Sequence, residues 1–66
     1  MGYRVKEIRE KLGMTQEELE RKSGISRQTI SAIENNQAKN VMVGTLRALA
    51  NALGTTIDNL FFEKAV

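Results

Sequence analysis

The side chains with the most specific chemistry in this sequence lie in residues 23–36, SGISRQTISAIENN. Ser26 is a favourable N-cap residue, and the helix predicted after it has only two large apolar side chains, Ile30 and Ile33. These two lie on one side of the helix because residues three apart share a face. The other side carries side chains that are small or form hydrogen bonds: Arg27, Gln28, Ser31 and Ala32. We predict that this side meets a polar partner at close range.

These residue types suit the edges of DNA bases in the major groove. A glutamine carboxamide forms two hydrogen bonds with adenine, an arginine guanidinium forms two with guanine, and a small apolar group packs against the thymine methyl group. A helix side that faced only water would instead carry mainly glutamate and lysine. We therefore predict base contacts from four residues: Arg27, Gln28, Ser31 and Ala32.

The distribution of charge along the chain agrees with an anionic partner. The 66 residues include ten basic and eight acidic residues, so the net charge is only +2. Residues 21–47, however, contain five basic residues and one acidic residue, Glu34, which gives this segment a net charge of +4. The flanking segments, 1–20 and 48–66, each have a net charge of −1. The positive charge thus lies where the polar helix is predicted, as DNA binding requires.

Composition argues against disulfides, metal sites, catalysis and membrane insertion. The sequence has no cysteine and no histidine, so disulfides are impossible, the usual zinc and copper ligand sets are missing, and we expect no cofactor. The carboxylates of residues 17–20 have no histidine or cysteine beside them, and we expect no enzymatic activity. No stretch has the roughly 18–20 apolar residues of a membrane span. We expect one small cytoplasmic domain, residues 1–66.

Apolar periodicity and capping residues predict five short helices that pack as an all-α bundle. Thr15 and Glu18 have the spacing of a capping box, which marks the start of the second helix. Only a short glycine-containing turn separates that helix from the third, which is the helix-turn-helix layout. The expected helices are residues 4–12, 15–23, 27–34, 43–53 and a last one that starts at 55–58.

Two stretches, MTQEELERKSGISRQTISAIENN and TLRALANALGTTIDNLF, resemble the xenobiotic-response-element family, which includes phage repressors and Cro proteins. The resemblance extends over about residues 5–61. It implies a compact five-helix, lambda-repressor-like bundle that binds a pseudo-palindromic operator as a homodimer, with the third helix in the major groove. It also implies a transcriptional regulator, most often a repressor, whose partner is double-stranded DNA.

By position, the resemblance implies roles for single residues. Gln28 matches the family's glutamine that reads adenine, and Arg27 and Ala32 fall at its other base-reading positions. Gln16 matches a glutamine that touches phosphate and supports the base-reading glutamine. The loop after the third helix usually holds the DNA backbone. The expected phosphate contacts are Gln16, Thr29, Asn35, Asn36 and Lys39.

Two further expectations concern the framework and the contact between subunits. Arg9 and Glu34 match a family ion pair that ties the first helix to the end of the third, and we expect this pair to be structural. Phe61 and Phe62 are adjacent, so they cannot both face one core from a helix. We expect the exposed one to form a dimer contact.

The sequence departs from the family pattern at several positions. Glu20 stands where the family has a small alanine packed under the third helix. A carboxylate there must reach solvent or find a partner such as Arg27, which would then be partly withdrawn from DNA. Asn36 replaces a glycine, a mild change because asparagine tolerates the left-handed conformation. The loop of residues 37–42 is about one residue longer than usual, and residues 42–44 offer no polar N-cap.

Three other interpretations of the sequence stay open. Two of them also bind DNA: an antitoxin that neutralises a toxin and represses its own operon, and a controller protein of a restriction–modification system. Neighbouring genes would separate these two. In the third, the chain is mainly a protein-interaction module that has kept the helix-turn-helix fold. Glu20 and the modest net charge favour that last interpretation.

Overall fold

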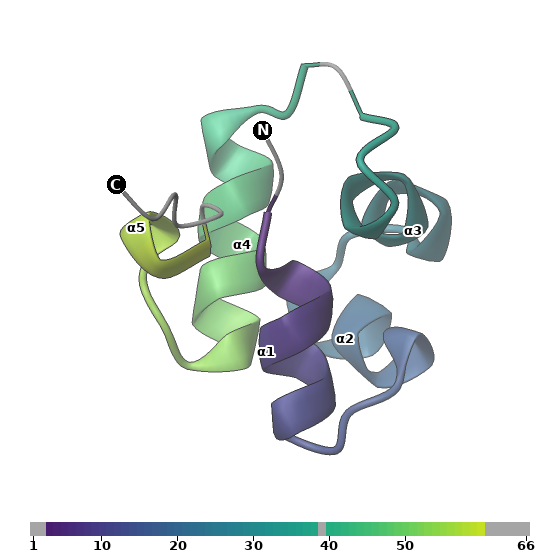
Figure 1. Ribbon diagram of the computed structural model, residues 1–66, viewed down its shortest axis with the longest axis vertical. Helices are drawn as coiled ribbons and strands as arrows, with labels where there is room; N and C mark the ends of the chain where they lie inside the picture. Colours follow the sequence, from purple (N-terminus) through teal and green to yellow (C-terminus); the bar gives the residue numbers. More distant parts are fainter. Residues whose placement is uncertain (1–2, 39, 61–66) are drawn as a thin grey trace.

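The computed structural model describes residues 3–38 and 40–60, which form five α-helices and no strand (Figure 1). The helices are α1 (Val5–Lys11), α2 (Gln16–Ser23), α3 (Arg27–Glu34), α4 (Val43–Leu53) and α5 (Ile57–Leu60). The predicted all-α class and the order of the helices are confirmed. None of these helices is both long and apolar enough to cross a bilayer.

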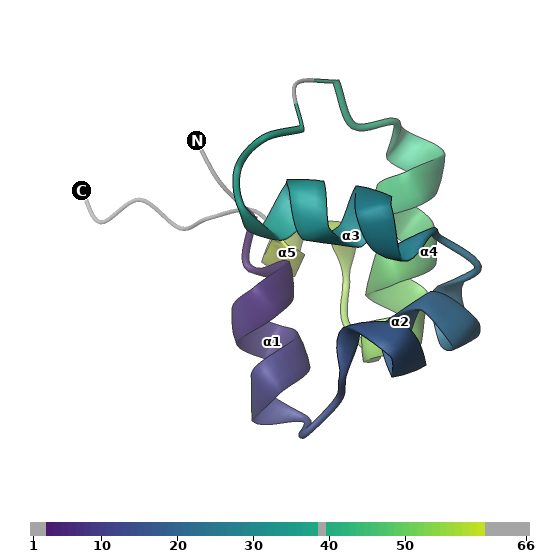
Figure 2. The same cartoon turned by 90° about the vertical axis from the view of Figure 1, so that its right-hand side faces the viewer.

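The longest helix, α4, lies at the centre of the bundle. It packs against α2 on one side and α5 on the other, and α1 contacts both α3 and α4 (Figure 1). In Figure 2, α3 lies on the side of the molecule that faces the viewer, and its axis makes a steep angle with the axis of α1. The arrangement therefore holds α3 at the surface, packed against α2 and α1.

Among the described residues, nine apolar side chains form a continuous core, and every helix contributes at least one of them. Ile30 and Ile33 of α3 are fully buried, as the periodicity predicted. Because their burial removes apolar area from water, this pair holds the inner side of α3 against the bundle. The nine residues are Val5, Leu19, Ile30, Ile33, Leu46, Leu49, Ala50, Leu53 and Leu60.

The helix ends differ slightly from those expected from the sequence. The first helix begins at Val5 and ends at Lys11, one residue inside the predicted range at each end. Asn36 has a φ of 58°, the left-handed conformation expected for it after α3. The start of α4 has no side-chain cap, as the apolar residues 42–44 predicted. The last described helix ends at Leu60, so Phe61 and Phe62 lie outside the described residues.

A capping box begins α2, as predicted. The Thr15 hydroxyl accepts the Glu18 N–H at 3.1 Å, and the Glu18 carboxylate accepts the Thr15 N–H at 3.0 Å. Each side chain thereby satisfies a backbone donor that the helix leaves unpaired.

Replacing this cap will weaken the fold by a modest amount. Thr15→Ala is expected to lower the free energy of unfolding by about 1 kcal/mol, because the Glu18 N–H loses its acceptor. Urea unfolding followed by circular dichroism measures the change. Thr15→Ser is the matched control, since it keeps the hydroxyl, and its stability should stay close to that of the wild type. Equal losses in both variants would show that the hydroxyl is not what stabilises α2.

Candidate nucleic-acid interface

The outer side of α3 is accessible along its whole length. Arg27, Gln28 and Thr29 are exposed, while Ser31 and Ala32 in the next turn are half-buried. The two isoleucines anchor the opposite side in the core. The structure therefore places the four predicted base-contacting residues on one external surface, which we call the α3 face: Arg27, Gln28, Ser31 and Ala32.

Two side chains cap the beginning of α3. The Ser26 hydroxyl accepts the Thr29 N–H at 3.2 Å and donates to the Thr29 hydroxyl at 3.0 Å. The Glu20 carboxylate, from α2, accepts the Arg27 N–H at 3.1 Å. The Gln28 N–H has no acceptor within the described part of the chain. One backbone donor at the positive end of the helix thus remains for an anionic ligand.

The Arg27 side chain is only weakly engaged in the free protein. Its guanidinium lies 3.7 Å from the Glu17 carboxylate, and these side chains are 59% and 76% exposed. Such an exposed pair contributes at most about 1 kcal/mol. Glu20 binds the Arg27 backbone and not its guanidinium, so the withdrawal of Arg27 that the sequence left open does not come from Glu20.

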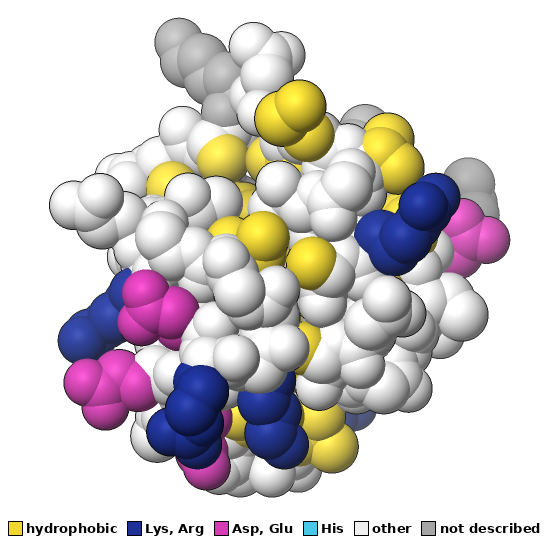
Figure 3. Space-filling view, turned by 180° about the vertical axis from the view of Figure 1, so that it is seen from behind, with side chains coloured by type: hydrophobic (Ala, Val, Ile, Leu, Met, Phe, Trp, Pro, Cys, Tyr) yellow, Lys and Arg dark blue, Asp and Glu magenta, His cyan; other side chains and the backbone are white. Residues whose placement is uncertain are grey.

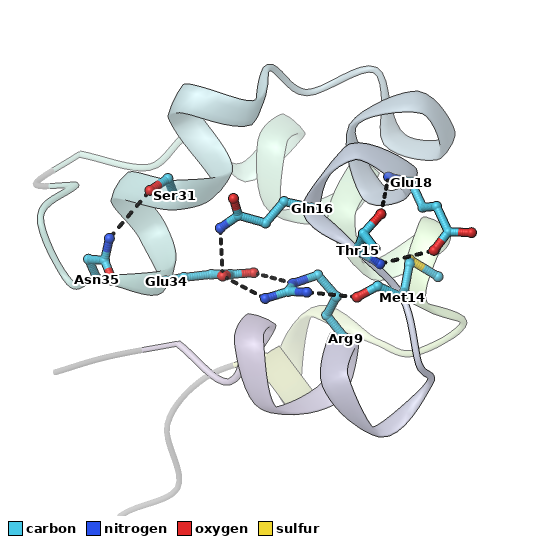
Figure 4. Close-up of polar contacts among 8 residues, drawn as sticks. All are labelled: Arg9, Met14, Thr15, Gln16, Glu18, Ser31, Glu34 and Asn35. Atoms are coloured by element: carbon cyan, nitrogen blue, oxygen red, sulfur yellow. Dashed lines mark hydrogen bonds and ion pairs between the residues drawn. The ribbon is translucent and has the colours of Figure 1, made fainter.

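At the end of α3, a largely buried network joins α1, α2 and α3 (Figure 4). The Arg9 guanidinium donates to both oxygens of Glu34, at 2.7 and 3.1 Å, and to the Met14 carbonyl at 2.7 Å. The Arg9 and Glu34 side chains are only 10% and 2% exposed. The hydrogen bonds to Glu34 raise the pKa of Arg9 above its usual value, so the guanidinium stays charged. The ion pair lies where the resemblance placed it, between α1 and the end of α3.

Gln16 belongs to this network, and its partner differs from the one expected. Its carboxamide nitrogen donates to Glu34 at 3.0 Å, and within the described residues it forms no hydrogen bond with Gln28. The expected support of Gln28 by Gln16 is therefore wrong for this structure. Gln16 reaches Glu34 because the first residue of α2 lies beside the last turn of α3 (Figure 4). Sequence spacing gave no signal for this contact, which joins two helices.

The end of α3 carries further polar groups. The Asn35 carboxamide donates to the Ser31 hydroxyl at 3.3 Å, one turn earlier (Figure 4). Asn36 is exposed directly after it. Lys39, the remaining expected phosphate contact, lies outside the described residues.

An open hollow borders the α3 face on its α2 side. It has a volume of about 370 Å³, and Thr15, Gln16, Glu17 and Arg27 are among the residues that line it. Residues at the start of α2 and Arg27 of α3 line the same hollow, so an extended ligand on the α3 face can contact both helices.

Basic charge is sparse on the surface seen from behind Figure 1. Lysine and arginine side chains are separated there by uncharged surface, and acidic side chains lie close to some of them (Figure 3). Among the described residues, this face forms no broad basic patch.

The helices α2 and α3, with the three residues between them, form a helix-turn-helix whose second helix is exposed. The family described as helix-turn-helix matches residues 5–60. The chain belongs to this family, in its Cro/C1-type branch of DNA-binding transcription regulators, which are not enzymes.

Individual relatives agree with the family. The chain is 41% identical over 56 residues to an uncharacterized HTH-type transcriptional regulator of Sinorhizobium fredii, covering 85% of this chain and 71% of that protein. The restriction-modification controller protein C.AhdI from Aeromonas hydrophila has a TM-score of 0.81 and 34% identity, over 88% of this chain and 86% of that one. A SinR–SinI protein complex has a TM-score of 0.84 and 28% identity, over 91% of this chain and 58% of that one.

Proposed function

We propose that the chain is a sequence-specific transcriptional repressor that binds a pseudo-palindromic operator as a homodimer in the cytoplasm. One observation carries the proposal: α3 buries Ile30 and Ile33 completely and presents the α3 face outward. Two recognition helices of a dimer would then enter successive major grooves about one helical turn apart.

The α3 face would supply the base contacts. Gln28 is exposed and its carboxamide has no partner among the described residues, so both of its hydrogen-bonding atoms are free for adenine. On binding DNA, Arg27 would give up its weak contact with Glu17 and bind a guanine edge or a phosphate. Ser31 and Ala32 are small enough for the helix to approach the bases closely.

Phosphate contacts would flank these bases at both ends of α3. Thr29 and the free Gln28 N–H lie near its start, and Gln16 lines the hollow that Arg27 also borders. Asn35 and Asn36 lie at its end, and Lys39 follows in the loop. The net charge of +4 over residues 21–47 supports this placement of an anionic backbone.

A titration with DNA tests where the ligand binds. We would follow backbone amide signals by NMR while adding a two-turn duplex of random sequence at low salt. The largest shifts are expected at Gln28, Ser31 and Asn35, and the smallest at Asn51, an exposed residue of α4. Shifts that map to α4 and leave the α3 face unchanged would contradict the proposed interface.

The homodimer is proposed through the end of α5, where Phe61 and Phe62 follow the buried Leu60. A chain of this size has a small core, and association commonly adds stability to such domains. Sedimentation equilibrium at micromolar concentration should give twice the mass of one chain. A mass of one chain, both alone and with operator DNA, would contradict a dimeric regulator.

A narrower role has some support from the comparisons. The likeness to the controller C.AhdI favours a controller of restriction–modification genes. The likeness to a SinR–SinI complex favours a regulator that also binds a protein, as an antitoxin-type or interaction-module role would require. Genes for a nuclease and a methyltransferase beside this gene would support the first role. Tight binding of a neighbouring gene's product, with weak and unselective DNA binding, would support the second.

A further inference from the structure

Glu20 holds both ends of the turn between α2 and α3. Its backbone carbonyl accepts the Gly24 N–H at 2.8 Å, where α2 ends. Its carboxylate accepts the Arg27 N–H at 3.1 Å, where α3 begins. Gly24 makes this geometry available because its φ of 76° turns the chain back toward α2. One residue of α2 therefore contacts both the end of that helix and the start of the next.

The hydrogen bond between the Glu20 carboxylate and the Arg27 N–H is expected to be stronger than one between neutral groups. The first N–H groups of a helix have no partner within the helix, and the helix end carries partial positive charge. A carboxylate there forms a charge-assisted hydrogen bond. Ser26 caps a different donor, the Thr29 N–H, so it cannot replace Glu20 at Arg27.

This contact lies at the residues that are proposed to read the DNA bases. Arg27 and Gln28 are the first two residues of α3, and both belong to the α3 face. A base contact depends on placing such side chains to within a fraction of an ångström, which a rigid supporting shell provides. The Glu17 carboxylate lies on α2, as Glu20 does, but it contacts only the exposed guanidinium of Arg27.

We propose that Glu20 is a positioning residue for base recognition: its oxygen fixes the first residue of α3, and with it the directions of Arg27 and Gln28. This inference rests on the proposed function, since it requires that α3 reads bases. The directed hydrogen bond to an acceptor oxygen aligns the start of α3, and the negative charge adds strength to this bond but no direction. Glutamine at this position keeps such an oxygen, whereas alanine does not.

The selectivity of three variants tests the proposal. The ratio of affinities for a preferred duplex and a scrambled duplex of equal length is measured at one salt concentration. Glu20→Ala should lower this ratio about five- to tenfold, because Arg27 and Gln28 lose their alignment. Glu20→Gln should keep the wild-type ratio within about twofold. Glu10→Ala, the matched loss of charge at an exposed residue of α1, should bind both duplexes more tightly by a similar factor and leave the ratio unchanged.

Amide hydrogen exchange provides a second readout without DNA. The Arg27 amide should exchange about fivefold faster in Glu20→Ala and at the wild-type rate in Glu20→Gln. The Thr29 amide, held by Ser26, is the internal reference and should not change. Unchanged exchange at Arg27 in Glu20→Ala would overturn the proposal.

The outcomes separate this inference from the function on which it rests. A wild-type preference that Glu20→Ala retains in full overturns the inference alone. An equal fall in the affinity ratio for Glu20→Gln and Glu20→Ala also overturns the inference, because the charge would then be responsible. If Glu20→Ala does not fold, the affinity ratio of Glu20→Gln alone decides. No preference in the wild-type protein contradicts the proposed function and this inference together.

Discussion

Replacing Gln28 with alanine is expected to weaken binding to the preferred operator by about 1–3 kcal/mol and to remove the preference at one base pair in each half-site. The Gln28 carboxamide is proposed to form two hydrogen bonds with a base edge, and alanine has no group that can form them. The side chain is exposed and has no partner among the described residues, so the fold should be unaffected, with a change in stability within about 0.5 kcal/mol.

The measurement is a set of dissociation constants for duplexes that carry each substitution of one base pair. The wild-type protein should discriminate at every contacted position, and Gln28→Ala should lose discrimination at one position and keep it elsewhere. Asn51→Ala is the control, because it removes an exposed carboxamide from α4. A Gln28→Ala protein that keeps the wild-type preference at every base pair would refute the assigned role.

The second large effect concerns stability. Arg9→Ala is expected to lower the free energy of unfolding by about 3–5 kcal/mol, because it leaves the carboxylate of Glu34 buried without its counter-charge. Gln16 would remain as a neutral donor to that carboxylate, and the Met14 carbonyl would lose its partner. Since domains of this size often have only about 3–5 kcal/mol in total, much of the variant should be unfolded at 25 °C.

Urea unfolding of matched variants measures this effect. Arg4→Ala is the control, because Arg4 pairs with Glu7 at 3.3 Å on the surface, and its loss should cost less than about 1 kcal/mol. The double replacement Arg9→Met with Glu34→Leu should recover most of the stability, since no charge is then buried alone. An Arg9→Ala protein as stable as Arg4→Ala would show that the buried pair does not support the fold.

Features that depend on local spacing could be predicted from the sequence. The burial of Ile30 and Ile33 follows from the helical period, and the bonds between Thr15 and Glu18 follow from their separation of three residues. The Arg9–Glu34 pair came from the family resemblance, because no local rule connects residues in different helices. The roles of the α3 face in DNA binding remain predictions.

Apart from the Arg9–Glu34 pair, contacts between helices through long polar side chains could not be predicted. Glu17 and Glu20 are three residues apart on α2, so both lie on the side toward the start of α3. Sequence alone could not decide which one binds the Arg27 backbone and which one lies near its guanidinium. The same holds for Gln16, whose flexible side chain could reach either Glu34 or Gln28 and bonds to Glu34.

The most direct test of the account is selection of bound duplexes from a random-sequence pool at physiological salt, followed by sequencing. We predict enrichment of a pseudo-palindrome whose half-sites lie about one helical turn apart, as expected for two α3 helices in successive major grooves. Folded protein that enriches no sequence would contradict a base-reading role for α3, and would favour a module whose partner is a protein.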